Sequence, residues 1–221
     1  MSFESSGRER ATAAAALPQR KVLHVGCGPR GLHRLHPVFH DLTRWREIRL
    51  DLDPSVEPDI VCSTADMRGH IANGTVDALW SSHNIEHLYD HDVSRALSEF
   101  ARVLRPDGFA LIRCPDLESV VTAILQDGLE TIAYHSPAGP ITPLDMLYGH
   151  RASVARGNDF MAHKTGFTDL RLGRLLLEAG FAHVNTKRAT GFDLWAIAFM
   201  PEANPDETLD ALACAGLSFE S

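Results

Sequence analysis

KVLHVGCGPRG, residues 21–31, is the stretch that decides the predicted fold. A short apolar run ends there in closely spaced glycines, and apolar residues at helical spacing follow to about residue 42, which predicts a strand, a tight loop and a helix. Gly26 and Gly28 have no Cβ, so the backbone can approach a ligand closely, and the amides that open a helix favour phosphate or carboxylate groups. The stretch predicts a site for a nucleotide-like cofactor, although a turn that needs only a left-handed backbone would also place glycines here.

Strand and helix patterns alternate along the rest of the chain. Apolar runs predict seven strands, over residues 21–25, 47–52, 59–62, 76–80, 109–114, 183–187 and 193–200. Helical spacing predicts further helices over about residues 90–104 and 168–180, and RPDG at residues 105–108 predicts a turn. This order predicts an α/β protein with a doubly wound, Rossmann-like sheet of seven strands, mostly parallel, whose last strand is antiparallel.

One domain is expected over residues 20–201. Residues 1–19 mix polar, charged and alanine residues without a period, so we expect a disordered arm. Residues 115–167 are irregular, rich in proline and glycine, and too long for an ordinary crossover, which predicts a lid-like insertion that covers the pocket and selects the substrate. The acidic segment 202–221 is expected to be a peripheral tail.

Composition argues against several classes of partner. The chain has 221 residues and a formal net charge of -8, whereas binding nucleic acid or an anionic membrane usually requires a concentrated basic face. The four cysteines are scattered and form no C-x-x-C pair, which favours a reducing cytoplasm. No apolar run approaches the roughly 18 residues of a spanning helix. We therefore expect a cytoplasmic protein with a small-molecule substrate and no nucleic-acid or membrane partner, its oligomeric state open.

Polar residues follow the predicted strands where a doubly wound sheet binds its ligand. Asp51 ends the second apolar run about 20 residues after the glycine loop, as an acid that binds ribose hydroxyls should. The loop STAD, residues 63–66, would deliver polar groups to the same crevice, and SSHNIEHL, residues 81–88, is the densest polar cluster in the chain. Because the carboxyl ends of parallel strands face the ligand, we expect the reacting substrate to meet this last loop.

Several motifs in the same order resemble one family. VLHVGCGPRG, IRLDLDP, STAD, VDALWSSHNIEHL and ARVLRPDGFALI, within residues 20–115, are similar to motifs of the class I S-adenosylmethionine-dependent methyltransferases, especially the bacterial group with EHL after the fourth strand. The resemblance implies S-adenosylmethionine as the cofactor. Two positions depart from the family pattern, because His24 stands where an acidic residue is usual and Arg30 where a glycine is usual.

The same resemblance implies roles for individual residues. The implied cofactor-binding residues are Gly26, Gly28, Asp51, Asp66, Ser81 and Ser82. The two glycines would let the backbone approach the methionine part of the cofactor, and Asp51 would accept its ribose hydroxyls. Asp66 would receive the adenine amino group, and one of the two serines would border the methionine end.

The loop after the fourth strand also contains H-x-x-E-H, residues 83–87, the pattern of inverted zinc proteases. That pattern needs a continuous helix and a third ligand, and here it begins at a strand end, so we expect no metal. We expect His87 or His163 to act as the base that takes the acceptor's proton, with Lys164 as a cation for an acidic substrate. A hydrogen-bonded Glu86–His87 pair that only shapes its loop, and solvated side chains at residues 163 and 164, would explain the same residues.

These patterns together predict methyl transfer from S-adenosylmethionine to a small-molecule or sugar-like acceptor. One alternative is a NAD(P)-binding oxidoreductase, since a glycine loop alone permits it. The short-chain version usually needs Tyr-x-x-x-Lys, and no tyrosine of this chain is followed by lysine at that spacing. The other alternative is a non-catalytic, cofactor-binding regulatory protein, which the unusual His24 favours.

Overall fold

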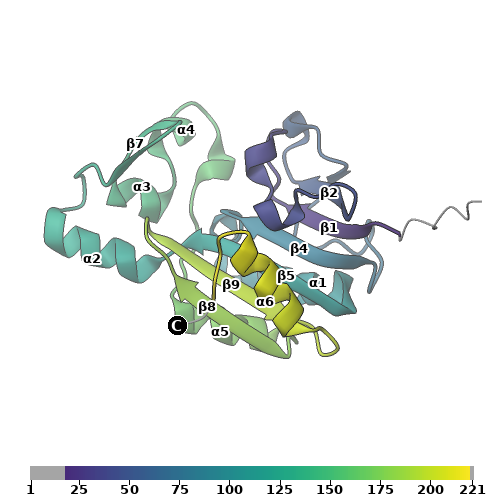
Figure 1. Cartoon of the computed structure of the whole chain (residues 1–221). Helices are drawn as coiled ribbons and strands as arrows, with labels where there is room; N and C mark the ends of the chain where they lie inside the picture. The colour runs from purple at the N-terminus through teal and green to yellow at the C-terminus, as the bar shows by residue number, and fades with distance from the viewer. Residues whose placement is uncertain (1–17, 220–221) are drawn as a thin grey trace, which may run out of the picture.

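The computed structural model describes residues 18–219, so the arm expected over residues 1–19 falls almost entirely outside the described range. A seven-stranded sheet in the order β3-β2-β1-β4-β5-β9-β8 forms the centre of the molecule (Figure 1). Its strands are β1 (Arg20–Val25), β2 (Trp45–Asp51), β3 (Ile60–Val61), β4 (Val76–Ser82), β5 (Leu104–Pro115), β8 (His183–Arg188) and β9 (Asp193–Phe199). The pairings from β3 through β5 are parallel, and β9 is antiparallel to both neighbours. The predicted sheet with its antiparallel last strand is confirmed.

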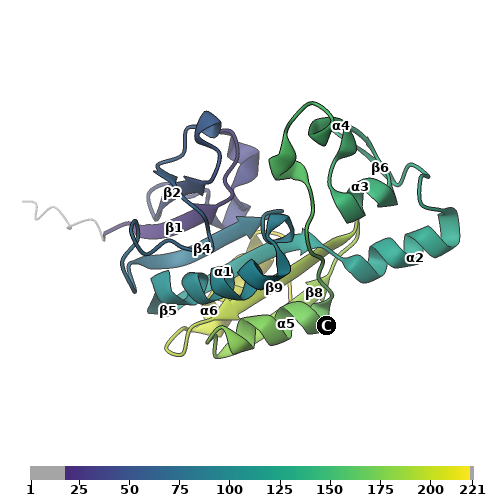
Figure 2. The ribbon, with the colours of Figure 1, turned by 180° about the vertical axis from the view of Figure 1, so that it is seen from behind.

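Helices cover both faces of the sheet. Figure 2 shows α1 (Asp90–Val103) and α5 (Asp169–Glu178) on one face, and Figure 1 shows α6 (Pro205–Cys214) on the other. Val93, Leu97 and Phe100 recur at helical spacing along α1 and are fully buried against the sheet. On the opposite face, Phe39 and Leu212 are fully buried in a second apolar cluster.

The helix expected after the glycine loop is wrong. The chain instead makes two short 3₁₀ turns, η1 (Leu32–Arg34) and η2 (Pro37–Phe39). Proline disfavours helical geometry at the residue before it, and His36 accordingly has extended backbone angles, with φ -63° and ψ 142°. The apolar spacing reflects burial all the same, because Phe39 packs edge-on against Trp45 at a ring separation of 5.0 Å.

The turn expected at residues 105–108 lies inside a strand. Val76 of β4 pairs with Leu104, and Ala78 pairs with Phe109, so the RPDG segment is extra length on β5 that bulges out of the ladder. A Cβ on Gly108 would lie 2.9 Å from the carbonyl oxygen of Asp77, which explains why a glycine is needed there. The proline and glycine of this segment do mark an irregularity at the expected position, but it is a bulge in a strand and not a turn between elements.

The C-terminal segment is part of the core and is not the peripheral tail that we expected. Leu212 of α6 is fully buried and Leu217 is 8% exposed, and the Lys187 ammonium of β8 donates to the carbonyl oxygen of Ser218 at 2.6 Å. The acidic residues Asp206 and Glu207 occupy the first turn of α6, where the helix dipole favours negative charge. The acidic residues of this segment therefore mark the start of a helix and not a peripheral tail.

The insertion between β5 and α5 is an ordered unit at the carboxyl ends of the strands (Figures 1 and 2). Its elements are α2 (Leu117–Asp127), β6 (Tyr134–Ser136), β7 (Gly139–Ile141), α3 (Pro143–Tyr148), α4 (Arg151–Val154) and η5 (Asp159–Met161). The insertion leaves and returns at one point, because the Leu117 amide donates to the carbonyl oxygen of Phe167 at 2.9 Å. The two ends of the insertion are therefore held together just beyond the end of β5.

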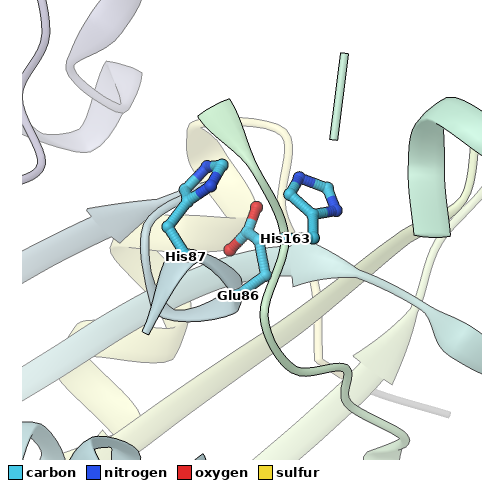
Figure 3. Close-up of side chains that lie close together, drawn as sticks. All are labelled: Glu86, His87 and His163. Atoms are coloured by element: carbon cyan, nitrogen blue, oxygen red, sulfur yellow. The ribbon is translucent and has the colours of Figure 1, made fainter. Parts of the chain in front are cut away.

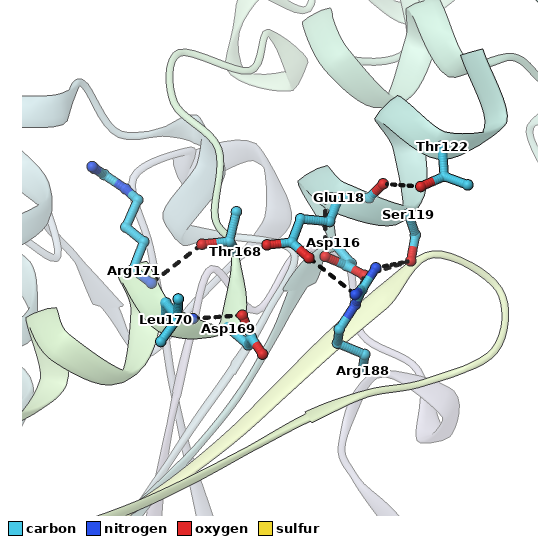
Figure 4. Close-up of polar contacts among 9 residues, drawn as sticks. All are labelled: Asp116, Glu118, Ser119, Thr122, Thr168, Asp169, Leu170, Arg171 and Arg188. Carbon is cyan, nitrogen blue, oxygen red and sulfur yellow. Dashed lines mark hydrogen bonds and ion pairs between the residues drawn. The ribbon is translucent and has the colours of Figure 1, made fainter. Parts of the chain in front are cut away.

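A buried carboxylate stabilises the point where the insertion leaves β5. Asp116 is fully buried, and Arg188 at the end of β8 donates to it at 2.7 Å (Figure 4). The same guanidinium donates to Glu118 at 3.0 Å and to Ser119 at 3.2 Å, in the first turn of α2. One side chain thus joins the insertion to the far edge of the sheet.

In the described part of the chain, no helix has the length and apolar character needed to cross a membrane.

Candidate functional site

A cleft of about 1160 Å³ runs across the carboxyl ends of the strands. The sheet places it there, because the strand order changes direction between β1 and β4, and open α/β sheets bind ligands at such a point. The glycine loop, the end of β2 and the loop after β4 line one part, and the insertion lines another. Among the predicted site residues, those that line it are Gly26, Gly28, Asp51, Ser82, His87, His163 and Lys164.

The glycine loop has a backbone that only glycine adopts readily. Gly26 and Gly28 have φ values of 61° and 58°. A Cβ on Gly26 would lie 2.3 Å from Nδ2 of Asn84, and one on Gly28 would lie 3.0 Å from the Arg34 guanidinium. A side chain at either position would clash with a neighbouring side chain of the same chain, so packing requires glycine here, and both glycines also line the cleft.

Asp51 connects this loop to the end of β2. Its two carboxylate oxygens accept the amides of Gly28 at 2.8 Å and of Asp53 at 3.0 Å. A carboxylate has about four acceptor positions, so Asp51, which is half-buried in the cleft, can still accept ligand hydroxyls. Beneath it the buried Arg49 donates to the carbonyl oxygens of Gly28 and of Glu57, the latter at 2.7 Å. We did not predict Arg49 from the sequence, although an arginine inside an apolar strand motif is a usable signal.

Two predicted cofactor residues do not reach the cleft as the structure describes it. Asp66 is exposed and lies outside the lining, whereas Ser63 and Thr64 of the same loop belong to it. Ser81 points into the core and is fully buried, because alternate residues of β4 face opposite sides of the sheet. Its neighbour Ser82 faces the cleft. The predicted roles of Asp66 and Ser81 therefore gain no support from their positions.

His24, where an acidic residue was expected, has a carboxylate beside it. The ring is buried, and its Nδ1 lies 2.6 Å from Oε1 of Glu47 on the neighbouring strand β2. His24 also lines the cleft. The negative charge that the family pattern places on β1 is thus supplied here from β2, one strand away.

The loop after β4 begins with a residue in a left-handed conformation, His83, at φ 48°. Its ring lies between two carboxylates, 3.3 Å from Glu86 and 3.4 Å from Asp193. Enclosure acts against its charge, but these two contacts outweigh it and raise the pKa of His83 to about 9. Arg113 of β5 also pairs with Asp193, at 2.5 Å. Arg113 and Asp193 are cleft residues that sequence reasoning did not find.

Glu86, His87 and His163 meet where the insertion covers this loop (Figure 3). The two imidazole rings are 4.9 Å apart in an edge arrangement, and Glu86, which is only 1% exposed, lies between them. Burial alone would raise the pKa of Glu86, but the imidazoles of His83, His87 and His163 lower it, so the group is a carboxylate at neutral pH. Burial lowers the pKa of His163, whose ring is neutral at pH 7. The two predicted bases are side by side, and a catalytic role for them stays a prediction.

Comparison with known proteins finds a matching family model and similar solved structures. A family model described as a methyltransferase domain matches residues 23–112. A SAM-dependent methyltransferase from Archaeoglobus fulgidus is 14% identical, with 82% of this chain and 86% of that chain covered, at a TM-score of 0.54. A protein from Pyrococcus horikoshii OT3 is 12% identical, with 83% and 82% covered, at a TM-score of 0.55.

A third similar structure is part of a larger chain. The CMeT domain of the citrinin polyketide synthase is 14% identical, with 85% of this chain covered, at a TM-score of 0.54. The present chain spans 47% of that chain's length. No curated protein matches the sequence.

Proposed function

We propose that this chain, whose residues 23–112 match a methyltransferase domain model, transfers a methyl group from S-adenosylmethionine to a small-molecule or sugar-like acceptor. The observation that carries the proposal is the single cleft in which the glycine loop, Asp51 and the polar loop after β4 meet. Its volume of about 1160 Å³ exceeds the usual range of small-molecule pockets, roughly 300–1,000 Å³, and so suits two ligands together. The net charge of -8 favours a small acceptor over a polyanion.

The residues at the glycine end fit the cofactor. Gly26 and Gly28 line the cleft without side chains of their own, and Asp51 offers acceptor positions for ribose hydroxyls. S-adenosylmethionine supplies a methyl group on a positively charged sulfur, already activated for transfer. What this chain adds is position, because it fixes the acceptor in line with that methyl group and excludes water with the insertion.

The acceptor would bind at the other end of the cleft. His87 and His163 lie there, and each Nδ1 is engaged with a backbone carbonyl oxygen, Ala162 at 3.1 Å and Met146 at 2.8 Å. A carbonyl oxygen only accepts, so Nδ1 carries the proton and Nε2 presents a lone pair. These lone pairs suit an acceptor hydroxyl. An oxidoreductase is set aside, because the matching family model describes methyltransferases.

Titration calorimetry tests the cofactor. S-adenosylmethionine or its demethylated product should bind, NAD and NADP should not, and Asp51→Ala should weaken binding by roughly 1–3 kcal/mol, the scale of a lost hydrogen bond to a charged group. Asp53→Ala is the matched control, because Asp53 lines the same cleft and caps the turn at Ser55. Equal losses of cofactor affinity in both variants would mean that Asp51 contributes only its negative charge. Tighter binding of NAD than of S-adenosylmethionine would refute the proposal.

Turnover tests the acceptor class. Purified protein with labelled S-adenosylmethionine should transfer the methyl group to a component of a small-metabolite pool and not to nucleic acid. Cofactor binding without transfer to any pool would favour the non-catalytic alternative.

A further inference from the structure

We propose that Glu86, His87 and His163 bind one divalent first-row transition ion, such as Zn²⁺ or Mn²⁺, at the acceptor end of the cleft. One potential ligand atom from each residue lies within 4.8 Å of the other two. All three residues line the cleft, and Figure 3 shows their side chains close together. Binding of the ion is argued from these residues alone, whereas its role rests on the proposed methyl transfer.

The state of the two histidines suits metal binding. Both donate Nδ1–H to a backbone carbonyl oxygen, so the tautomer that leaves Nε2 free to bind an ion is the one that the hydrogen bonds select. Histidines that bind metals usually have their other nitrogen fixed in this way, because the hydrogen bond sets the tautomer and the ring orientation. Two such lone pairs beside a carboxylate form a ligand set, and an ion bound to them would take the place of a histidine base.

Glu86 is the independent observation that points to a ligand. It is 1% exposed, and within residues 18–219 neither of its carboxylate oxygens has a hydrogen-bond partner. Buried polar groups are nearly always hydrogen-bonded, and a buried carboxylate is expensive unless it is paired or coordinates a metal. The ion-pair contact with His83, at 3.3 Å, reaches only Oε1 and comes from a ring on the exposed side. A cation between Glu86 and the two imidazoles would satisfy the carboxylate.

The donor set selects the kind of ion. Two imidazole nitrogens and one carboxylate oxygen suit zinc and other first-row transition ions, whereas magnesium and calcium prefer oxygen ligands. Three protein ligands are typical of catalytic zinc sites, which keep an open position for water or substrate. Here that position would face the cleft, where an acceptor oxygen could bind the ion and become polarised.

The backbone around the triad is fixed on both sides. The amide of Lys164 donates to the carbonyl oxygen of Glu86 at 2.8 Å, which joins the insertion to the loop after β4. Gly149 forms a bridge with Ala162, and a Cβ on Gly149 would lie 1.9 Å from the carbonyl oxygen of Met161. His163 is therefore delivered to the triad by a close backbone approach that a larger residue would prevent.

This ligand set differs from the H-x-x-E-H pattern for which we expected no metal. The pattern would use His83 and His87, but the ring of His83 extends toward Asp193, with Nε2 at 3.4 Å from that carboxylate. The third ligand is His163, which the pattern does not contain. The two sets make opposite predictions for substitutions at His83 and His163.

The experiment uses the full-length chain without a histidine tag, stripped with a chelator and then titrated separately with Zn²⁺, Mn²⁺ and Mg²⁺ by calorimetry. Elemental analysis after dialysis should find about one Zn²⁺ or Mn²⁺ per chain and no stoichiometric Mg²⁺. His163→Ala and Glu86→Gln should each weaken binding at least about 100-fold, since each removes a direct ligand. His83→Ala is the matched control and should change metal affinity less than about threefold, and the exposed His70→Ala controls for surface sites.

Thermal melts and S-adenosylmethionine affinity of each variant show whether it folds, and the Co²⁺ absorption spectrum of the wild type reports the site without any variant. Absence of stoichiometric binding by the wild type would overturn the proposal, as would binding that is unchanged in His163→Ala. A loss in His83→Ala as large as in His163→Ala would also overturn it, in favour of the sequence pattern. Failure of S-adenosylmethionine binding with metal binding intact would refute the proposed function and leave the site.

Discussion

Lowering the pH from 7 to 4.5 should destabilise the fold through His36, a buried histidine in the cleft. The ring is 7% exposed and lies between Trp80 and Trp195, each with a ring separation of 5.6 Å. Its Nδ1 accepts the backbone amide of Val38 at 3.2 Å, which requires an unprotonated nitrogen. Burial, with the positive charges of His40 and Arg113 nearby, lowers the pKa of His36 from 6.5 to about 4.

The sign and size of the effect follow from linkage. In the unfolded chain the imidazole takes up its proton near pH 6.5, but in the folded protein it does so only near pH 4, so the unfolded state gains protons first as the pH falls. Stability is therefore fully present above pH 6.5 and is lost as the pH falls toward 4. Between pH 7 and 4.5 this single group should lower the free energy of unfolding by about 2 kcal/mol.

The assay is urea unfolding at pH 7, 6, 5 and 4.5 at constant ionic strength, for the wild type and His36→Asn. Asparagine keeps a neutral N-cap acceptor for η2 and removes the titration. Because other groups titrate in this range, the measured quantity is the difference in pH dependence between the two proteins. The exposed His91→Asn should retain the wild-type slope. If His36→Asn loses stability with pH as steeply as the wild type, the argument from burial is refuted.

Two further predictions concern packing. Gly149→Ala, whose Cβ would lie 1.9 Å from the carbonyl oxygen of Met161, should lower the melting temperature and the metal affinity while cofactor affinity changes less than about twofold. Gly157→Ala, with a similar φ of 90° but no atom within 4 Å, is its control, and equal effects would mean that backbone strain alone is responsible. Leu212→Ala should lower the free energy of unfolding in urea by about 2–4 kcal/mol, whereas the control Leu170→Ala, at an 81% exposed side chain, should leave it almost unchanged. A small loss at Leu212 would mean that α6 is not part of the core.

The sheet was predictable because its strands are short apolar runs separated by glycine, proline and acidic residues. The alternation of strand and helix patterns predicted the parallel part of the sheet, and the closing pair of strands predicted the antiparallel last strand. What failed is local and has local causes. Pro37 prevents the helix that the apolar spacing after the glycine loop suggests, because it keeps His36 extended. The spacing in that segment arises from burial of Phe39, so periodicity alone indicated the wrong element.

The cofactor end of the cleft was predictable in part. Gly26, Gly28 and Asp51 are close to strand ends, so the topology of the sheet is enough to place them together. The topology of the sheet does not determine the side of the sheet to which each side chain points. Ser81 and Ser82 differ by one residue in β4, and the pleat sends the first into the core and the second to the cleft. Nothing in the local sequence distinguishes two adjacent serines.

The acceptor end required the three-dimensional structure for a definite physical reason. Histidines at positions i and i+4 share a ligand only on a continuous helix, and the chain between His83 and His87 is not one, because His83 has φ 48° and only the short turn η4 (Ile85–His87) follows. The two rings consequently diverge, one toward Asp193 and the other toward the insertion. The place that a second helical histidine would take beside Glu86 is occupied by His163, which a close backbone approach at Gly149 brings in from a distant part of the chain. A sequence pattern that assumes a helix therefore selects the wrong histidine here, because the segment that contains it follows directly on the end of β4 and forms only a short turn.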